Sequence, residues 1–552
     1  MAAGPRHLLN ASPRDHFPSC PFPFRRHQGI SMSDPRTARE ASSDAVYLRS
    51  LGYEQRFERS VSLWSNFALG FLYLSPLVGV IALFAQGLTT AGPPVVWWII
   101  IAAGGQFLVS LVFGEVVSQY PIAGGLYQWA RRLWSGSYAW MLSWIYIAGV
   151  IIGITTTALF SADFVAALLH GGADDPGVAS GPGEKFVIAL IVTGLGLLLN
   201  ATGSKTLARI AKVGLAAELA GIILVGLYLL VFERHNSVSV FFDSMGTGGS
   251  GGYTGPFLAS ALVGLLLFYG FEACGEVAEE TPDPGRTIPR SMQMTVSVGG
   301  AAALFAFVGY VLAAPDLESI VSGKISNPIP AILQSSLGTV GTKVFLVVAL
   351  TSFLACVMGQ QAAASRLIFS FARDGMFPRS TWFSKMSAKT HVPINALIAA
   401  NVLPVAIYVF VYYSPDSLFR IASFQMLAGY CAFQMVVFAS LRARAKGWRP
   451  AGVFSLGTAG WPVAIAALAY GVFSMIMLAK PSGDSGLAFY DRWISLIGFL
   501  VVAGTGLIYL LVAKPYRKSD APEGDALDMM RRIQTVENTR LTAAPAEGHI
   551  HD

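Results

Sequence analysis

The sequence predicts an all-helical protein that crosses a membrane about twelve times. Hydrophobic residues make up 54% of its 552 residues and charged residues only 13%, whereas soluble proteins carry about 25% charged residues. About twelve apolar runs are long enough to span a bilayer. Two of these runs are interrupted, at Pro76 and around Gly270. Paired interruptions of this kind are typical of transporters whose binding site lies between broken helices.

The expected spans are the apolar runs of the sequence, and their ends are approximate. They cover 62–86, 94–116, 137–162, 186–202, 212–232, 256–275, 293–314, 343–365, 393–412, 418–440, 460–479 and 493–513.

Charges alternate between the loops and indicate the topology. One set of loops is rich in Lys and Arg, namely the N-terminal tail, 131–132, 205–212, 286–290, 373–389, 442–449 and 514–518. The other set carries mostly acidic residues, including Asp174, Glu184, Asp243 and Glu318. By the positive-inside rule, both termini are expected in the cytoplasm. The net charge of +6 therefore reflects topology, and we expect no nucleic-acid partner.

Both termini are polar. Residues 1–59 contain no signal peptide, and Met32 is a second plausible start. We expect a largely disordered cytoplasmic tail over 1–59, with a short interfacial helix over Leu48–Phe57. The tail after Lys514 is expected to be disordered as well.

The first interruption lies in NFALGFLYLSPLVGVIALF, where Pro76 lacks a backbone donor and Gly79 lacks a side chain. A simple kink at Pro76 is the alternative. The second lies in 265–290, an apolar run that continues into Glu272, Glu276, Glu279 and Glu280. A carboxylate in mid-membrane costs roughly 3 kcal/mol or more, which indicates a functional site.

Four stretches resemble the amino acid/polyamine/organocation transporter superfamily, in particular its amino acid/choline (GABA permease-like) branch. They are LWSNFALGFLYLSPLVG (63–79), GEVVSQYPIAGGLYQWA (114–129), the run from Gly270 to Arg290, and ASRLIFSFARDGMFP (364–378). The resemblance covers about 48–518. It implies a LeuT-like inverted repeat of five plus five helices, over 60–235 and 236–445, with discontinuous helices 1 and 6. Two further helices follow over 446–515, and the C-terminal tail covers 516–552.

The resemblance also implies a substrate site. Backbone N–H groups of Ser75, Leu77, Val78 and Gly79 at the first break would bind a carboxylate. The alternative for Ser75 is a bond back to its own helix. At the second break, Phe268, Tyr269, Gly270, Phe271 and Glu272 would face the substrate's cationic end, with Tyr146 as an aromatic neighbour. Glu272 is alternatively a proton relay or structural partner, and Tyr146 a packing residue.

Glu218 stands where several relatives carry a Lys that substitutes for a sodium ion. A buried carboxyl group tends to keep its proton, so Glu218, Glu272 and Glu276 are candidates for coupling to protons or a cation. The alternative for Glu218 is a carboxylate bonded to Ser or Thr. If Glu218→Gln changed neither uptake nor its pH dependence, the coupling role would be wrong.

On the cytoplasmic side, Glu279 and Glu280 are expected to form gate ion pairs with Arg286, Arg290 or Arg366. The loop with Arg131 and Arg132 is expected to close the inner vestibule; a solvated basic loop is the alternative.

The sequence therefore predicts a permease of the plasma membrane for an amino acid or related amine such as GABA, choline or a polyamine. We expect coupling to protons rather than Na⁺ and no cofactor. The alternatives are an exchanger or a non-transporting nutrient receptor. An enzyme is disfavoured, since the sequence has no Walker A loop and no metal-ligand spacing. The sequence does not indicate the oligomeric state.

Overall fold

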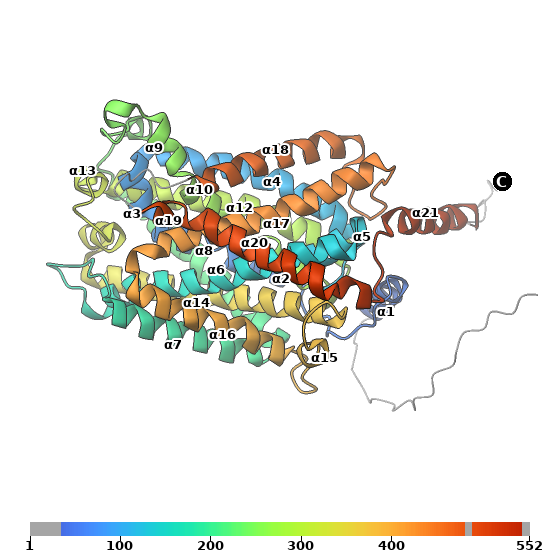
Figure 1. The fold of residues 1–552 in the computed structure, drawn as a ribbon. Helices are drawn as coiled ribbons and strands as arrows, with labels where there is room; N and C mark the ends of the chain where they lie inside the picture. Colours follow the sequence, from blue (N-terminus) through green and yellow to red (C-terminus); the bar gives the residue numbers. More distant parts are fainter. Residues whose placement is uncertain (1–34, 481–487, 544–552) are drawn as a thin grey trace, which may run out of the picture.

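The computed structural model describes residues 35–480 and 488–543, and this part of the chain contains helices and no strand. Eleven of the helical segments are long and apolar enough to cross a membrane. They run side by side in one elongated bundle, with α9, α13 and α19 at one end and α1, α5, α15 and α21 at the other (Figure 1).

The long helices follow the expected spans closely. Their bounds are α2 (Leu63–Leu74), α3 (Pro76–Ala91), α4 (Val96–Gln119), α6 (Gly136–His170), α7 (Pro182–Ala201), α8 (Ser204–Phe232), α12 (Pro284–Ala313), α14 (Pro328–Arg373), α16 (Ile394–Tyr413), α17 (Leu418–Ala445), α18 (Gly460–Ala479) and α20 (Ile494–Ala513).

Short helices connect or flank them. These are α1 (Pro35–Ser50), α5 (Gly125–Leu133), α9 (Thr254–Ala259), α10 (Ala261–Leu267), α11 (Ala273–Glu276), α13 (Leu317–Val321), α15 (Ser380–Phe383), α19 (Phe489–Arg492) and α21 (Ala526–Ala543). Single 3₁₀ turns are η1 (Pro93–Val95), η2 (Val238–Phe242), η3 (Gly249–Gly251), η4 (Ala278–Glu280), η5 (Pro415–Ser417), η6 (Gly457–Ala459) and η7 (Pro515–Lys518).

The expected spans 62–86 and 256–275 are the two that the structure breaks. The first is α2 and α3, separated at Ser75. Of their most apolar stretch of 18 residues, 94% is buried. The second is α9 and α10, then five non-helical residues, then α11. The long helix α14 also contains a kink, at Gly338, so only its part after Gly338 corresponds to the expected span 343–365.

Burial separates central helices from peripheral ones. The most apolar stretch of α6 is 83% buried, whereas the corresponding stretches of α7 and α8 are 22% buried and that of α20 only 11%. Helices that face lipid on most of their surface remain apolar there, because lipid tails replace water as their surroundings. The broken helices therefore lie in the centre of the bundle, where protein rather than lipid surrounds the free backbone groups of each break.

The described part of the N-terminal tail is ordered, so the predicted disorder over 1–59 is wrong for 35–59. Helix α1 ends at Ser50, and Gly52 then turns the chain in the left-handed region at φ 90°. The chain continues without a helix through the buried side chains of Tyr53 and Phe57. The predicted interfacial helix over Leu48–Phe57 is therefore wrong too. Only its first residues are helical, because the turn at Gly52 ends α1. Met32 lies outside the described residues.

The described part of the C-terminal tail is also ordered, against the prediction for 516–552. Arg131 donates to the carbonyls of Pro522 (3.1 Å) and Ala521 (2.6 Å). Arg132 pairs with Asp525 at 2.5 Å. Glu523 accepts from the Gly136 N–H at the start of α6 (2.6 Å). The basic loop that was expected to be solvated or to close the vestibule therefore binds the C-terminal segment.

Removal of residues 519–552 is expected to destabilise the protein. Arg131 and Arg132 are fully buried, and each buried polar group left without a partner costs about 1–3 kcal/mol. Thermal unfolding in detergent measures the loss. A shorter truncation after Ala543 keeps all of these contacts and serves as the control; equal melting temperatures for the two truncations would contradict the bracing role of the segment.

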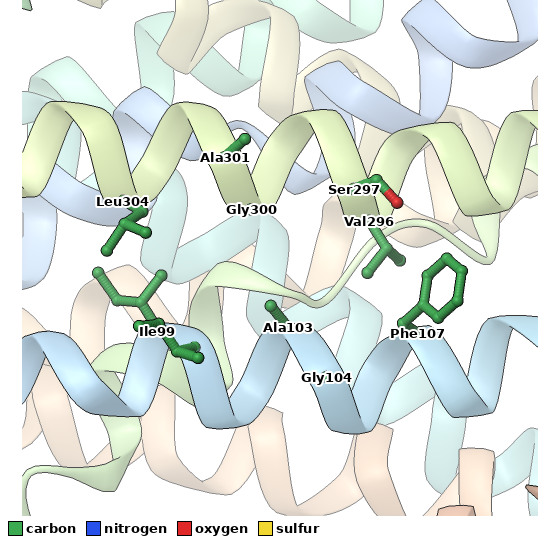
Figure 2. A pocket seen from close by; sticks show the side chains of 10 residues that line it. Ile99, Ala103, Gly104, Phe107, Val296, Ser297, Gly300, Ala301 and Leu304 are labelled. Carbon is green, nitrogen blue, oxygen red and sulfur yellow. The ribbon is translucent and has the colours of Figure 1, made fainter.

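A separate apolar groove lies between α4 and α12 and faces outward from the bundle (Figure 2). Its volume is about 420 Å³. Small residues make room for it, and Ser297 is the one lining residue with a polar side chain; the others are Ile99, Ile100, Ala103, Gly104, Phe107, Val296, Gly300, Ala301 and Leu304. A lining of this kind suits hydrocarbon and offers no partners to a charged substrate.

Candidate functional site

The first break is closed by a carboxylate from a distant helix. Pro76 begins α3, and Ser75 before it adopts a left-handed conformation with φ 38°, rare for a residue other than glycine. Glu218 Oε1, from α8, accepts from Ser75 Oγ at 2.9 Å and from the Leu77 N–H at 3.0 Å. Glu218 is fully buried. It thus caps α3 with a carboxyl oxygen at the positive end of the helix dipole.

The second break lies directly against the first. Gly270 adopts φ 124°, and a Cβ there would be 2.7 Å from the Leu74 nitrogen. Glu272 folds back on the break: its Oε2 accepts from the Gly270 N–H (2.9 Å), and its Oε1 accepts from the Tyr146 hydroxyl (2.7 Å). Tyr146, for which packing was the stated alternative, is therefore a direct partner of the mid-membrane carboxylate.

A small cavity of about 30 Å³ lies between the two breaks. It is lined by Tyr73, Leu74, Val78, Gly79, Ala82, Thr156, Thr157, Phe160, Leu266, Tyr269, Cys356, Gln360 and Gln425. One water molecule needs about 10–15 Å³ by this measure. The cavity therefore has room for about two waters, and the structure shows the site in a closed state.

Three of the residues predicted to bind substrate line this cavity: Val78, Gly79 and Tyr269. Ser75 and Leu77 do not line it; in this state both donate hydrogen bonds to Glu218. Phe268, Gly270, Phe271, Glu272 and Tyr146 do not line the cavity either. They are buried around the second break.

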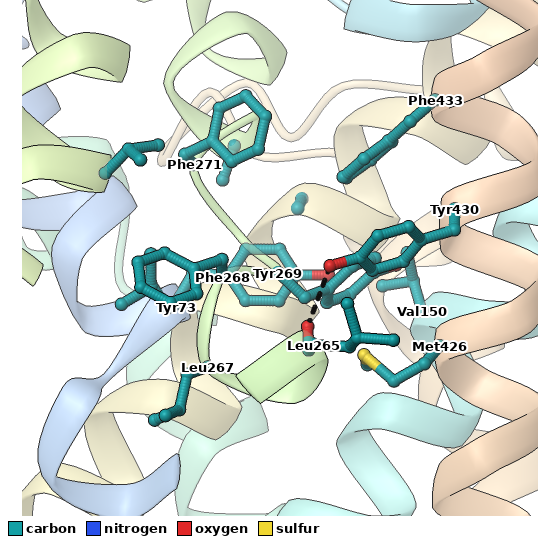
Figure 3. Close-up of a cluster of buried hydrophobic side chains, with 14 of the residues drawn as sticks. Tyr73, Val150, Leu265, Leu267, Phe268, Tyr269, Phe271, Met426, Tyr430 and Phe433 are labelled. Atoms are coloured by element: carbon teal, nitrogen blue, oxygen red, sulfur yellow. Dashed lines mark hydrogen bonds between the residues drawn. The ribbon is translucent and has the colours of Figure 1, made fainter. Parts of the chain in front are cut away.

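Aromatic rings gather around the second break, where Tyr269 and Phe271 lie near Phe433 (Figure 3). Tyr269 lies edge-on to Tyr73 at 5.7 Å between ring centroids and stacks on Phe433 at 5.7 Å. Tyr146 meets Tyr269 at 6.4 Å. Phe271 contacts Phe433 at 5.6 Å between ring centroids. Aromatic faces next to a carboxylate are a favourable environment for a cation.

Six polar residues of the cavity wall, Tyr73 among them, were not predicted from the sequence. Thr156 donates to Gln425 (2.7 Å), and Gln360 donates to Thr157 (3.0 Å) and to the Cys356 sulfur (3.5 Å). Gln360 Oε1 and the hydroxyls of Tyr73 and Tyr269 are buried and have no hydrogen-bond partner within the described residues. Buried polar atoms are normally paired, which makes these atoms candidate ligand contacts. Amide side chains in the middle of apolar spans were the sequence signal that could have identified this wall.

Below the second break, acids and arginines form a gate network that closes one end of the bundle. Arg366 pairs with Glu280 at 3.0 Å, and Arg373 pairs with Glu279 at 2.9 Å. Glu279 also accepts from the Ala123 N–H at 3.1 Å. The predicted partnership of Arg366 is thus present. Arg286 is exposed at the start of α12 and forms none of the ion pairs found in 35–480 and 488–543, so its predicted gate role is wrong.

Asp374 ties the N-terminal segment to the gate network. It accepts hydrogen bonds from Tyr53 (3.1 Å), Tyr127 (2.9 Å) and Gln128 (2.9 Å). Burial and the nearby Asp374 carboxylate raise the pKa of Tyr53 above its ordinary value, so its hydroxyl stays protonated and donates. Residues 51–59 are therefore held in place by the same contacts that form the closed gate.

Glu276 lies between the cavity and the gate network. It is fully buried, both of its oxygens lack a hydrogen-bond partner in the described chain, and one would be 2.6 Å from a Cβ placed on Gly125. At the opposite end of the bundle, a larger hollow of about 610 Å³ lies among α3, α9, α10, α17 and α20. The closed site therefore has a sealed side and a hollowed side, as expected for alternating access.

Gly270→Ala is expected to impair folding and transport. The left-handed conformation at φ 124° disfavours any other residue, and the added Cβ would meet the backbone of the first break. Backbone strain of this kind costs on the order of 1–3 kcal/mol. The control is Gly104→Ala, where a Cβ meets nothing within 4 Å. Thermal unfolding and uptake are measured for both variants. If Gly270→Ala melted and transported like Gly104→Ala, the two breaks would not need the close approach of Gly270 to the backbone of the first break.

Comparison with known proteins supports this architecture. Residues 61–504 match the family described as amino acid permease. An amino-acid permease of Arabidopsis thaliana, BAT1, is 27% identical, covering 85% of this chain and 94% of its own. Its homologue in Oryza sativa subsp. japonica is 24% identical, over 79% and 87%. A putative polyamine transporter of Candida albicans is 24% identical, over 86% and 88%. Because the family match covers most of its length, the chain belongs to the amino acid permease family.

Proposed function

We propose that the protein is a secondary active transporter that moves an amino acid or related amine across the plasma membrane by alternating access. The observation that carries the proposal is the pair of broken helices enclosing a polar cavity, with buried carboxylates at both breaks. Half-helices that meet around a central cavity place free backbone groups and charges at the substrate. Relatives named amino-acid permease and putative polyamine transporter support the same class of substrate.

Coupling to protons fits the positions of the acids. Glu218, Glu272 and Glu276 are fully buried in the centre of the bundle. Glu276, between the cavity and the gate network, has no partner for either oxygen in the described part. A proton that binds there changes the charge next to the gate, because an unpaired buried charge is costly. This set of acids favours protons over Na⁺ as the coupling ion, and the transport cycle needs no cofactor.

The orientation is proposed from the loop charges, with both termini and the gate network in the cytoplasm. The positive-inside rule supports this assignment. The 610 Å³ hollow would then open toward the outside. Nothing in the proposed cycle requires an enzymatic step. The residues from 35 to 480 and from 488 to 543 hold no group of three or more His, Cys, Asp or Glu side chains that could bind a metal ion.

Reconstitution of the purified chain in liposomes tests the proposal. Labelled amino acids, GABA, choline and putrescine are offered with and without an inward proton gradient, and with and without internal substrate. Accumulation that follows the proton gradient supports a symporter. Uptake that requires internal substrate makes the protein an exchanger. Binding without flux, in vesicles shown to be intact, overturns the transporter in favour of a receptor.

A further inference from the structure

We propose that the substrate is an amine without a carboxylate, of the diamine or polyamine class, because the protein's own Glu218 occupies the helix end where a substrate carboxylate would bind. This inference rests on the proposed function and names the substrate class of the same cavity.

The start of α3 has little capacity left for an anion. Pro76 has no N–H, the Leu77 N–H donates to Glu218, and the Gly79 N–H donates to the Ser75 carbonyl at 3.0 Å. Ser75 Oγ donates to the same carboxylate oxygen of Glu218. At most the Val78 N–H remains for a ligand. A helix N-terminus binds anions through these N–H groups and its dipole, and here an internal carboxylate already uses both.

The charge around the cavity disfavours a second carboxylate. None of the thirteen described residues that line it is a Lys, Arg or His. Glu218 lies at the first break and Glu272 at the second, and both are fully buried. Arg366, on the gate side, is held by Glu280 at 3.0 Å. When ionised, these two acids repel an incoming carboxylate and attract an ammonium group.

The free polar atoms can all accept a hydrogen bond. Glu218 Oε2 and Gln360 Oε1 are buried without a partner in the described part of the chain, as are the hydroxyls of Tyr73 and Tyr269. An ammonium group has three donors and no acceptor, so it complements all four atoms, whereas a carboxylate could use only the two hydroxyls, which also donate. Apolar side chains of Leu74, Val78 and Leu266 between the polar groups suit the methylene chain of a diamine.

The rings around Glu272 complete the site for a cation. Tyr73 and Tyr269 line the cavity, whereas Tyr146 and Phe433 pack against Tyr269 outside the lining, at centroid distances of 6.4 and 5.7 Å. An ammonium group in the cavity would meet the rings of Tyr73 and Tyr269, and a ring face attracts a cation. The cavity thus offers acceptors and rings, with one buried carboxyl group at each break, which is chemistry that suits an alkylamine with a positive charge at each end.

The test compares putrescine with GABA, which have the same four-carbon chain and differ in one terminal group. Full-length protein in proteoliposomes is expected to take up labelled putrescine with at least tenfold higher kcat/KM than GABA, and unlabelled putrescine is expected to compete better than leucine. Equal or better transport of GABA or leucine would overturn the proposal and leave the transporter function standing. Absence of flux for every compound in intact vesicles would overturn both.

Glu218→Gln tests the role of the charge. Glutamine keeps the size of the side chain and removes the repulsion, so the preference for putrescine over GABA is expected to fall at least tenfold. Glu233→Gln, at the partly exposed end of the same helix, is the matched control and is expected to keep the preference. An unchanged preference in a folded Glu218→Gln would contradict the proposal. If that variant does not fold, the wild-type comparison of putrescine with GABA still decides it.

Discussion

Glu272→Gln is expected to reduce uptake at least about 100-fold, which corresponds to about 2.7 kcal/mol. The carboxylate is fully buried and holds the Gly270 N–H and the Tyr146 hydroxyl together at the second break. Glutamine keeps the shape of the side chain but removes the negative charge that attracts a cationic substrate. Initial rates of uptake in proteoliposomes measure the effect.

Two further variants separate charge from structure at this position. Tyr146→Phe removes one hydrogen bond and keeps the carboxylate, so we expect a loss of about 10- to 100-fold, in line with the 1.5–3 kcal/mol of a hydrogen bond to a charged group. Glu54→Gln changes an exposed acid and is expected to have no effect. Near-normal uptake by Glu272→Gln would show that the acid is only a structural partner.

Arg366→Ala is expected to lower the free energy of unfolding by about 3–5 kcal/mol, because removal of one partner leaves the other charge buried and unpaired. The side chains of Arg366 and Glu280 are each only 1% exposed. Arg366 also donates to Ser365 Oγ at 3.1 Å. Chemical unfolding in mixed micelles measures the loss, and the gate is expected to leak when the pair is missing.

An apolar double variant separates ion-pair loss from loss of volume. Arg366→Met combined with Glu280→Leu removes both charges, and such replacements are often neutral or stabilising, so we expect most of the lost stability to return. Lys205→Ala breaks the exposed pair of Lys205 with Glu58, whose side chains are 62% and 44% exposed, and is expected to cost at most about 1 kcal/mol. Equal costs for Arg366→Ala and Lys205→Ala would contradict a closed, dry gate.

The sequence predicted the parts of the fold that depend on local signals. Long apolar runs gave the spans, and Pro76 and Gly270 located the two breaks, because a missing donor and a left-handed backbone interrupt a helix wherever it lies. It also placed Glu272 in the membrane and paired Arg366 with an acid of the 279–280 turn. These inferences need only the cost of buried charge and the chemistry of each residue.

The errors concern contacts between segments far apart in the chain. The tails read as disordered because their composition is polar, but Arg131 and Arg132 bind the segment that contains Asp525, and Tyr53 binds Asp374. Arg286 has the right charge for the gate but lies on the exposed side of its helix. Nothing local to either segment distinguishes these outcomes.

The candidate site divides in the same way between features that local sequence predicts and contacts that only the packed bundle shows. Glu218 was singled out as an unusual acid, yet its bond to the Leu77 N–H, 141 positions away, is a property of the packed bundle. Thr156, Gln360 and Gln425 were overlooked because each is one polar residue in an apolar span. Their common wall appears only when α6, α14 and α17 are placed together.

Protection of Cys356 tests the central claim that substrate binds between the two breaks. The Cys356 sulfur is buried in the cavity wall, where it donates to the Tyr73 carbonyl at 3.2 Å. A variant in which Cys20, Cys274 and Cys431 are replaced by alanine leaves one thiol, which a small thiol reagent reaches when the site opens. We predict that a transported amine slows this labelling with the same half-saturation as transport, and that labelling abolishes uptake. Labelling at the same rate with and without substrate, in protein that still transports after modification, would contradict the account.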